Sequence, residues 1–231
     1  MKKTHQLFFG KFKNEVTSPL GIETVESTRY LGLILDADLR WDTHINSLCQ
    51  KLSSAIFALR RINSVTTHAT TRIAYHALVE SHIRYGIIFC GDSSKENTNR
   101  VFVLQKQAMR ILGGLQQLES CRDVFRTLRI PTVISIYICE VVTFACNQNI
   151  LKNADVHYHY TRNADKFNLS LHRTTRYSKK PSYAGARIFN LLPVSIRNGR
   201  PKTFKRRLMD WLLDYPVYSM EEFMERCEQH L

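Results

Sequence analysis

The spacing of hydrophobic residues changes once along the chain, within residues 22–44. Through residues 30–35 the apolar positions alternate or form a short run, which indicates β-strands. From Ile45 onward they recur at intervals of three and four, which indicates helices. Residues 5–12 and 23–25 supply the other expected strands. The pattern predicts a mainly helical α+β protein, with a small N-terminal antiparallel sheet joined to a helical body.

Capping and stop residues set the expected bounds of the helices. Asp42 or Thr43 is expected to cap the first helix, and glycines at 86 and 113–114 are expected to end the second and third. Residues 219–222 match a capping box that would open the last helix. These helices are expected over about residues 45–61, 67–85 and 94–112, with others at 120–128 and 203–214 and one short helix within 183–196.

Residues 130–146 form the longest weakly polar run, and their pattern fits two structures. Ile134, Ile136 and Ile138 alternate as in a strand, but other apolar residues of the run follow helical spacing. Its length favours a helix. Glu140 at its centre would cost roughly 3 kcal/mol in a bilayer, so the run is expected to be buried in protein.

The net charge of +13 is concentrated in one part of the chain. Residues 161–207 hold 13 Lys and Arg but a single acid, whereas residues 208–231 carry six acids against one Arg. Residues 157–182 are also polar and rich in Tyr, Thr and Ser, and we expect a loop or a loosely held strand there. Such a cationic segment favours a polyanionic partner, nucleic acid before an anionic membrane surface.

Six cysteines are scattered without a C-x-x-C pair, which argues against a disulfide framework and a structural zinc site. The N-terminal sequence MKKTHQLFFGKFK has too short an apolar stretch for a signal peptide. We therefore expect an intracellular protein, nuclear or cytoplasmic, with free thiols, no bound metal and no membrane partner.

Motifs along nearly the whole chain resemble those of the jockey-like reverse transcriptases of LINE-type, non-LTR retrotransposons. No single motif is specific, but their order and spacing together support the resemblance. The motifs are Tyr30-Leu-Gly-Leu-Ile-Leu-Asp36, Leu39-x-Trp41, His44-Ile45, Ser81-x-x-x-Tyr85-Gly86, Leu104-Gln105 with Arg110-Ile111, Tyr160-Thr161-Arg162, Tyr183-x-Gly185, Asn190-Leu-Leu-Pro193, Phe204-Lys205 and Tyr218-Ser219.

The resemblance implies a role for each part of the chain. Residues 1–38 would contain the end of the palm and the primer-grip strands, which set a primer 3′ end against catalytic metals. Residues 39–152 would form a helical thumb over the product duplex. Residues 153–202 would be a basic, loop-rich segment that holds template RNA or target DNA, and residues 203–231 would be C-terminal helices.

The residues that such a polymerase needs for catalysis are missing from this sequence. Nucleotidyl transfer uses Mg²⁺ ions held by carboxylates, typically an adjacent Asp-Asp pair and a third Asp, and no Asp-Asp pair occurs here. Asp36 and Asp38 match the family's exit turn, outside its metal site. Met1 stands at a position that is internal to the family's sequence, so we expect a truncated copy. Alone it would be inactive, with no cofactor and no catalytic residue. Its partner could be the missing polymerase half.

Candidate nucleic-acid-binding residues come from the grip and from the basic segment. Lys3 would lie near a nucleotide's phosphates only beside a palm; alone it fits a solvated strand edge. Tyr30 and Trp41 could contact a primer, but aromatic residues where a strand meets a helix more often fill the core. The full set is Lys3, Tyr30, Gly32, Arg162, Arg173, Arg176, Lys179, Lys180, Arg187, Lys202, Lys205 and Arg206.

Two readings of the basic segment remain open. Its cations alternate with aromatic residues, a mixture that binds phosphates and stacks bases of RNA or DNA without sequence preference. Alternatively the segment is a solvated linker, and the helical body is a protein-interaction module or a non-functional retroelement fragment.

Overall fold

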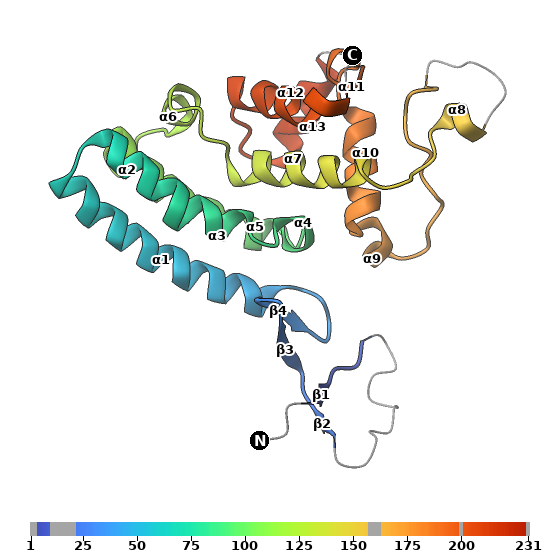
Figure 1. Ribbon diagram of the computed structural model, residues 1–231, viewed down its shortest axis with the longest axis horizontal. Helices are drawn as coiled ribbons and strands as arrows, with labels where there is room; N and C mark the ends of the chain where they lie inside the picture. Colours follow the sequence, from blue (N-terminus) through green and yellow to red (C-terminus); the bar gives the residue numbers. More distant parts are fainter. Residues whose placement is uncertain (1–3, 10–21, 157–162, 199–200, 230–231) are drawn as a thin grey trace.

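The computed structural model describes residues 4–9, 22–156, 163–198 and 201–229, and most of them are helical (Figure 1). Two very short sheets extend from one end of the helical body. The predicted mainly helical α+β fold is therefore confirmed. Within these residues, no helix has both the length and the apolar character that crossing a bilayer requires.

The N-terminal strands form two separate pairs instead of one antiparallel sheet. Strand β1 (His5–Gln6) runs parallel to β2 (Glu23–Thr24), and β3 (Ser27–Tyr30) runs antiparallel to β4 (Leu33–Asp36). A strand is expected over residues 5–12, but only His5–Gln6 form one and residues 7–9 do not. Residues 10–12 lie outside the described residues.

The strand expected at residues 30–35 is interrupted by a hairpin turn, because Tyr30 ends β3 and Leu33 begins β4. Tyr30 pairs with Leu33 across a two-residue loop, in which Leu31 has φ 46° and Gly32 has φ 79°. Positive φ at both loop residues matches the twist of antiparallel strands and makes this a favoured hairpin turn. Glycine adopts this φ without steric cost, whereas Leu31 is strained by it.

Helix α1 (Asp42–Val65) begins without the expected side-chain cap. Its N-cap residue is Trp41, in the left-handed conformation, so Asp42 and Thr43 already lie inside the helix. The carboxylate of Asp36 instead accepts hydrogen bonds from the backbone N–H groups of Arg40 and Trp41, both at 2.9 Å. The turn between the hairpin and α1 is therefore fixed by the last residue of β4.

The second expected helix is confirmed as a continuous rod that contains one wider turn. Its parts are α2 (His68–Tyr75), the π-helical turn η1 (His76–Glu80) and α3 (Ser81–Arg84). Gly86, at φ 73°, ends the rod, and the short helix α4 (Ile87–Cys90) follows.

The third expected helix is also confirmed. Helix α5 (Lys95–Gly113) begins where the Ser94 side chain accepts the N–H of Asn97, and it ends at Gly114 in the left-handed conformation. Its buried face packs along α1, and α6 (Arg122–Thr127) follows it.

Helix α7 (Val133–Cys146) is the centre of the fold (Figure 1). Ten of its 14 residues are buried, which confirms a helix surrounded by protein. It packs against α4 and α5 on one side and against α10 (Pro181–Leu191) and α12 (Pro201–Asp214) on the other. One hydrophobic cluster runs through these layers, from Ile45 to Cys227.

The C-terminal third is more helical than expected. Besides α10 and α12 it contains α8 (Asn153–Val156), α9 (Thr175–Ser178), α11 (Val194–Arg197) and α13 (Met220–Glu228). Helix α9 lies within the segment expected to be a loop, and the Thr174 side chain caps it. The Ser219 side chain accepts the N–H of Glu222, as the capping box predicts.

Candidate nucleic-acid interface

The tip of the β3–β4 hairpin is docked on the end of α3. The hydroxyl of Tyr85 donates a hydrogen bond to the carbonyl of Leu31 in the hairpin turn. A Cβ atom at Gly32 would lie 3.2 Å from the Tyr85 ring, and one at Gly86 would overlap the side chain of Leu33. Two motifs that are about fifty residues apart in the sequence therefore meet in space.

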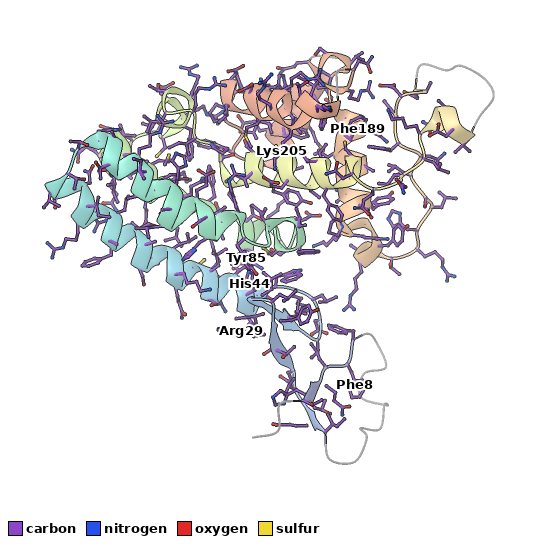
Figure 2. The ribbon with its side chains drawn as sticks, in the orientation of Figure 1. Phe8, Arg29, His44, Tyr85, Phe189 and Lys205 are labelled. Atoms are coloured by element: carbon purple, nitrogen blue, oxygen red, sulfur yellow. The ribbon has the colours of Figure 1, made fainter. Side chains whose placement is uncertain are left out.

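Strand β4 of the hairpin is held by the first turn of α1. His44 is buried, and its Nδ1 accepts a hydrogen bond from the backbone N–H of Ile34 at 3.4 Å. The Trp41 ring meets the His44 ring edge-on, with centroids 6.1 Å apart, and packs against the core. Figure 2 shows His44 and Tyr85 close together at this joint, near Arg29 of β3. The hairpin is thus held by Tyr85 at its turn and by His44 along β4.

The contact between His44 and the hairpin is expected to make the fold less stable in acid. Burial, and secondarily the charge of Lys51, lowers the pKa of His44 below its ordinary 6.5. The unfolded chain then binds a proton more readily than the folded one, so stability is complete above pH 6.5 and falls as the pH drops below it. Urea unfolding at pH 7.5 and 5.5 should show this loss, at most about 1.4 kcal/mol per pH unit from one group.

The variant H44N tests the origin of that loss. An asparagine side-chain oxygen can accept the N–H of Ile34 as Nδ1 does, but it does not titrate. The difference in unfolding free energy between the two pH values should therefore shrink in H44N. An unchanged difference would mean that another group is responsible.

The turn of the hairpin presents apolar side chains to solvent. Tyr30 is 62% exposed and Leu31 is 73% exposed. The expectation that aromatic residues between the hairpin and α1 fill the core is correct for Trp41, which packs against it, and wrong for Tyr30, whose side chain is mostly exposed. The Tyr30 ring is therefore available for an external contact.

The basic segment reaches the hairpin joint through α9. Arg176 donates to the carbonyl of Asp38, 3.3 Å away, in the turn that follows β4. Lys179 donates to the carbonyl of Ser93, 2.6 Å away, in the turn that precedes α5. These two bonds place α9 between the hairpin joint and the start of α5.

Exposed cations lie among aromatic rings from the residues just before α9 to the second turn of α10. We call this set the α9 basic surface, and its cations are Arg173, Arg176, Lys179, Lys180 and Arg187. The rings of His172, Tyr177 and Tyr183 contact one another with centroids 4.7–5.5 Å apart, and Lys180 lies over the Tyr177 ring at 5.8 Å. Five of the twelve candidate residues therefore lie together.

The candidates on α12 do not join this surface. Lys202, Lys205 and Arg206 are exposed, but α12 lies at the opposite end of α10 from α9 (Figure 1). Lys205 is paired with Glu140 of α7 at 2.7 Å, and Glu140 also pairs with Arg84 at 2.8 Å. Lys3 and Arg162 lie outside the described residues.

Two further cations of the basic segment point inward. Arg197 is buried and pairs with Asp165 at 3.3 Å, and Arg207 donates to the carbonyl of Ile196 at 3.1 Å. The count of cations in the sequence therefore overstates the charge that faces solvent. Arg197 ends α11 and Arg207 lies on the amphipathic helix α12, and nothing in the sequence indicates that either side chain faces inward.

The Asp36-x-Asp38 pair is part of a turn. Besides the two amides at the start of α1, the Asp36 carboxylate accepts the N–H of Asp38 at 3.2 Å. These three bonds organise the exit from β4. In the part of the chain that the structure describes, no group of three or more His, Cys, Asp or Glu side chains is arranged to hold a metal ion.

Comparison with known proteins connects this arrangement to a class of polymerases. The chain is 28% identical over 141 residues to a probable RNA-directed DNA polymerase from transposon BS of Drosophila melanogaster, which covers 57% of this chain and 16% of that protein. It is 24% identical over 110 residues to the RNA-directed DNA polymerase from mobile element jockey of the same species, covering 46% of this chain and 12% of that protein.

A jockey polymerase from Drosophila funebris gives a similar match, 28% identical over 109 residues. The chain thus spans at most about one sixth of the length of these curated relatives. No family model and no solved structure matches it. Over about half its length, the chain is a homologue of the RNA-directed DNA polymerases of Drosophila transposons, jockey among them.

Proposed function

We propose that this chain corresponds to the post-catalytic part of a jockey-like, non-LTR reverse transcriptase and binds RNA or DNA without sequence preference. The β3–β4 hairpin would be the primer grip, and the helices from α1 to α7 would form the thumb. The observation that carries the binding proposal is the α9 basic surface, which is fastened to the turn directly after the hairpin.

The chemistry of this surface suits a phosphate backbone. Lys and Arg contacts to phosphates release counterions, a gain that does not depend on base sequence. Exposed Tyr rings beside them can stack on bases of any kind. Tyr177 is 38% exposed and lies among the cations, and Tyr30 is exposed on the hairpin, which Arg176 connects to α9. A strand could therefore contact both elements at once.

Binding should depend strongly on salt. If about six phosphates are contacted, the logarithm of the affinity for duplex DNA should fall with the logarithm of salt concentration with a slope near −5. Fluorescence anisotropy with labelled duplex and single-stranded oligonucleotides of unrelated sequence measures this slope. An affinity that is undetectable, or that does not change with salt, would contradict the proposal.

The chain alone should not extend a primer. Two-metal nucleotidyl transfer depends on closely placed carboxylates, and the 231 residues contain no adjacent Asp pair. Incubation with a primed template, deoxynucleotides and Mg²⁺ or Mn²⁺ should therefore give no product, beside a complete reverse transcriptase as positive control. Clear nucleotide incorporation by the purified chain would overturn this part of the proposal.

A further inference from the structure

A pocket of about 450 Å³ lies between the turn that precedes α5, the first two turns of α7 and the start of α13. Its volume falls within the roughly 300–1,000 Å³ of small-ligand sites. Three aromatic residues, Phe102, Tyr137 and Tyr218, line it, with Asp92 and Lys179 among its polar residues. The proposed function does not use this pocket.

The aromatic residues give the pocket flat apolar walls. Phe102 and Tyr137 are buried, and the Tyr218 ring meets the Phe102 ring edge-on with centroids 4.8 Å apart. Gly91 allows Tyr137 its position, because a Cβ atom at Gly91 would overlap the Tyr137 ring. Such walls favour a planar aromatic ligand over a branched aliphatic one.

Asp92 supplies a half-buried carboxylate to the lining of the pocket. Among the described residues, none donates a hydrogen bond to its carboxylate, although the side chain is partly buried. Burial raises the pKa of Asp92, and the nearby charges of Lys179 and Arg187 oppose that rise. A ligand with N–H donors could therefore form charge-assisted hydrogen bonds to this carboxylate, beside Lys179 and Arg187.

The pocket is continuous with the α9 basic surface. Lys179 lines the pocket and is also one of the five cations of that surface, and its bond to Ser93 holds it next to Asp92. The charge of Arg187 acts on Asp92 as well as on Tyr137. A strand whose phosphates lie on the surface would thus have its bases within reach of the pocket.

We propose that this pocket holds an unpaired guanine base of a nucleic-acid strand whose phosphates lie on the α9 basic surface, an inference that rests on the proposed function. A carboxylate can accept two neighbouring N–H groups at once. Guanine presents such a pair, N1–H and the N2 amino group, on its Watson–Crick edge, and the other common bases do not. Unpaired bases are read on this edge while they stack on aromatic side chains.

The test compares oligonucleotides that differ by one base. Uridine 12-mers with a single central guanosine, inosine or adenosine are titrated against the full chain by fluorescence anisotropy. Inosine keeps N1–H but lacks the N2 amino group, so comparing it with guanosine measures the contribution of the N2 hydrogen bond alone. The guanosine strand should bind about tenfold more tightly than either of the others, as expected for one well-made bidentate contact.

Two variants locate the preference in the pocket. D92N removes the second acceptor and should abolish the preference for guanosine while leaving the salt slope unchanged. D123N makes the same change in charge on the exposed face of α6 and should keep the preference. As a readout independent of affinity, 6-thioguanosine at the central position should photocrosslink to a peptide that contains Phe102, Tyr137 or Tyr218.

The outcomes separate the two proposals. Equal, salt-dependent binding of all three strands, or a crosslink confined to residues outside the pocket, would overturn the guanine pocket and leave the proposed function intact. A preference that survives in D92N would also overturn it, provided that thermal unfolding shows the variant to be folded. Absence of binding to every strand would overturn both.

Discussion

Replacing Arg173, Arg176 and Lys180 together by alanine is expected to weaken binding to duplex DNA about 100-fold at roughly 0.1 M salt. All three side chains are exposed on the α9 basic surface. Each phosphate contact adds about 0.9 to the salt slope, so the slope should also fall in magnitude by nearly three, from about −5 to near −2. Anisotropy titrations over a salt series measure both quantities. Lys179 is left in place because it also lines the guanine pocket.

The matched control removes three exposed arginines from the other end of the molecule. Arg60 and Arg61 lie near the end of α1, and Arg72 lies on α2. Their combined replacement by alanine changes the net charge equally but is expected to weaken binding less than about threefold, because screening limits the effect of distant charges. Equal losses in both triple variants would mean that net charge, and not the α9 basic surface, accounts for binding.

Replacing Gly185 by alanine is expected to destabilise the protein by about 3 kcal/mol. Gly185 lies where α10 crosses α7, and a Cβ atom there would overlap the carbonyl oxygen of Val141 and crowd the Cβ of Ala145. Backbone atoms cannot move aside as the end of a flexible side chain can, so the two helices would have to separate. Urea unfolding followed by circular dichroism measures the change.

Gly114 provides the comparison for that variant. It has φ 63° at the end of α5, and a Cβ atom there would have nothing within 4 Å. Alanine at this position should cost only the strain of the left-handed conformation, about 1 kcal/mol. If G114A proved as damaging as G185A, the overlap with α7 would not be the main cost at Gly185.

The helical part of the fold could be predicted because its signals are local. Ser94 and Gly114 bound α5 within one residue of the expected positions, and the length of residues 130–146 decided correctly between strand and helix. The hairpin could not be predicted in this way. Its loop places Leu31 at positive φ, a conformation that leucine rarely adopts, and contacts with Tyr85 and His44 hold the chain in this turn.

The sequence predicted which types of residue form the candidate site, but not which of those residues face solvent together. An excess of cations among aromatic residues is visible in the sequence, whereas the side that each cation faces depends on packing. Arg197 is buried against Asp165, and Lys205 is committed to Glu140, so neither adds freely to a binding surface. The hydrogen bond from Arg176 to Asp38 joins residues that are 138 positions apart in the sequence, and residue patterns cannot predict contacts over that separation.

The burial of most of α7 has a consequence for how the chain folds during synthesis. Ile136, Ile138 and Val142 leave the ribosome well before the residues of α10 and α12 that cover them. At ordinary translation rates this interval is on the order of seconds, long enough for an exposed apolar helix to associate with other chains. The nascent protein should therefore need a chaperone most between the emergence of α7 and the completion of α12.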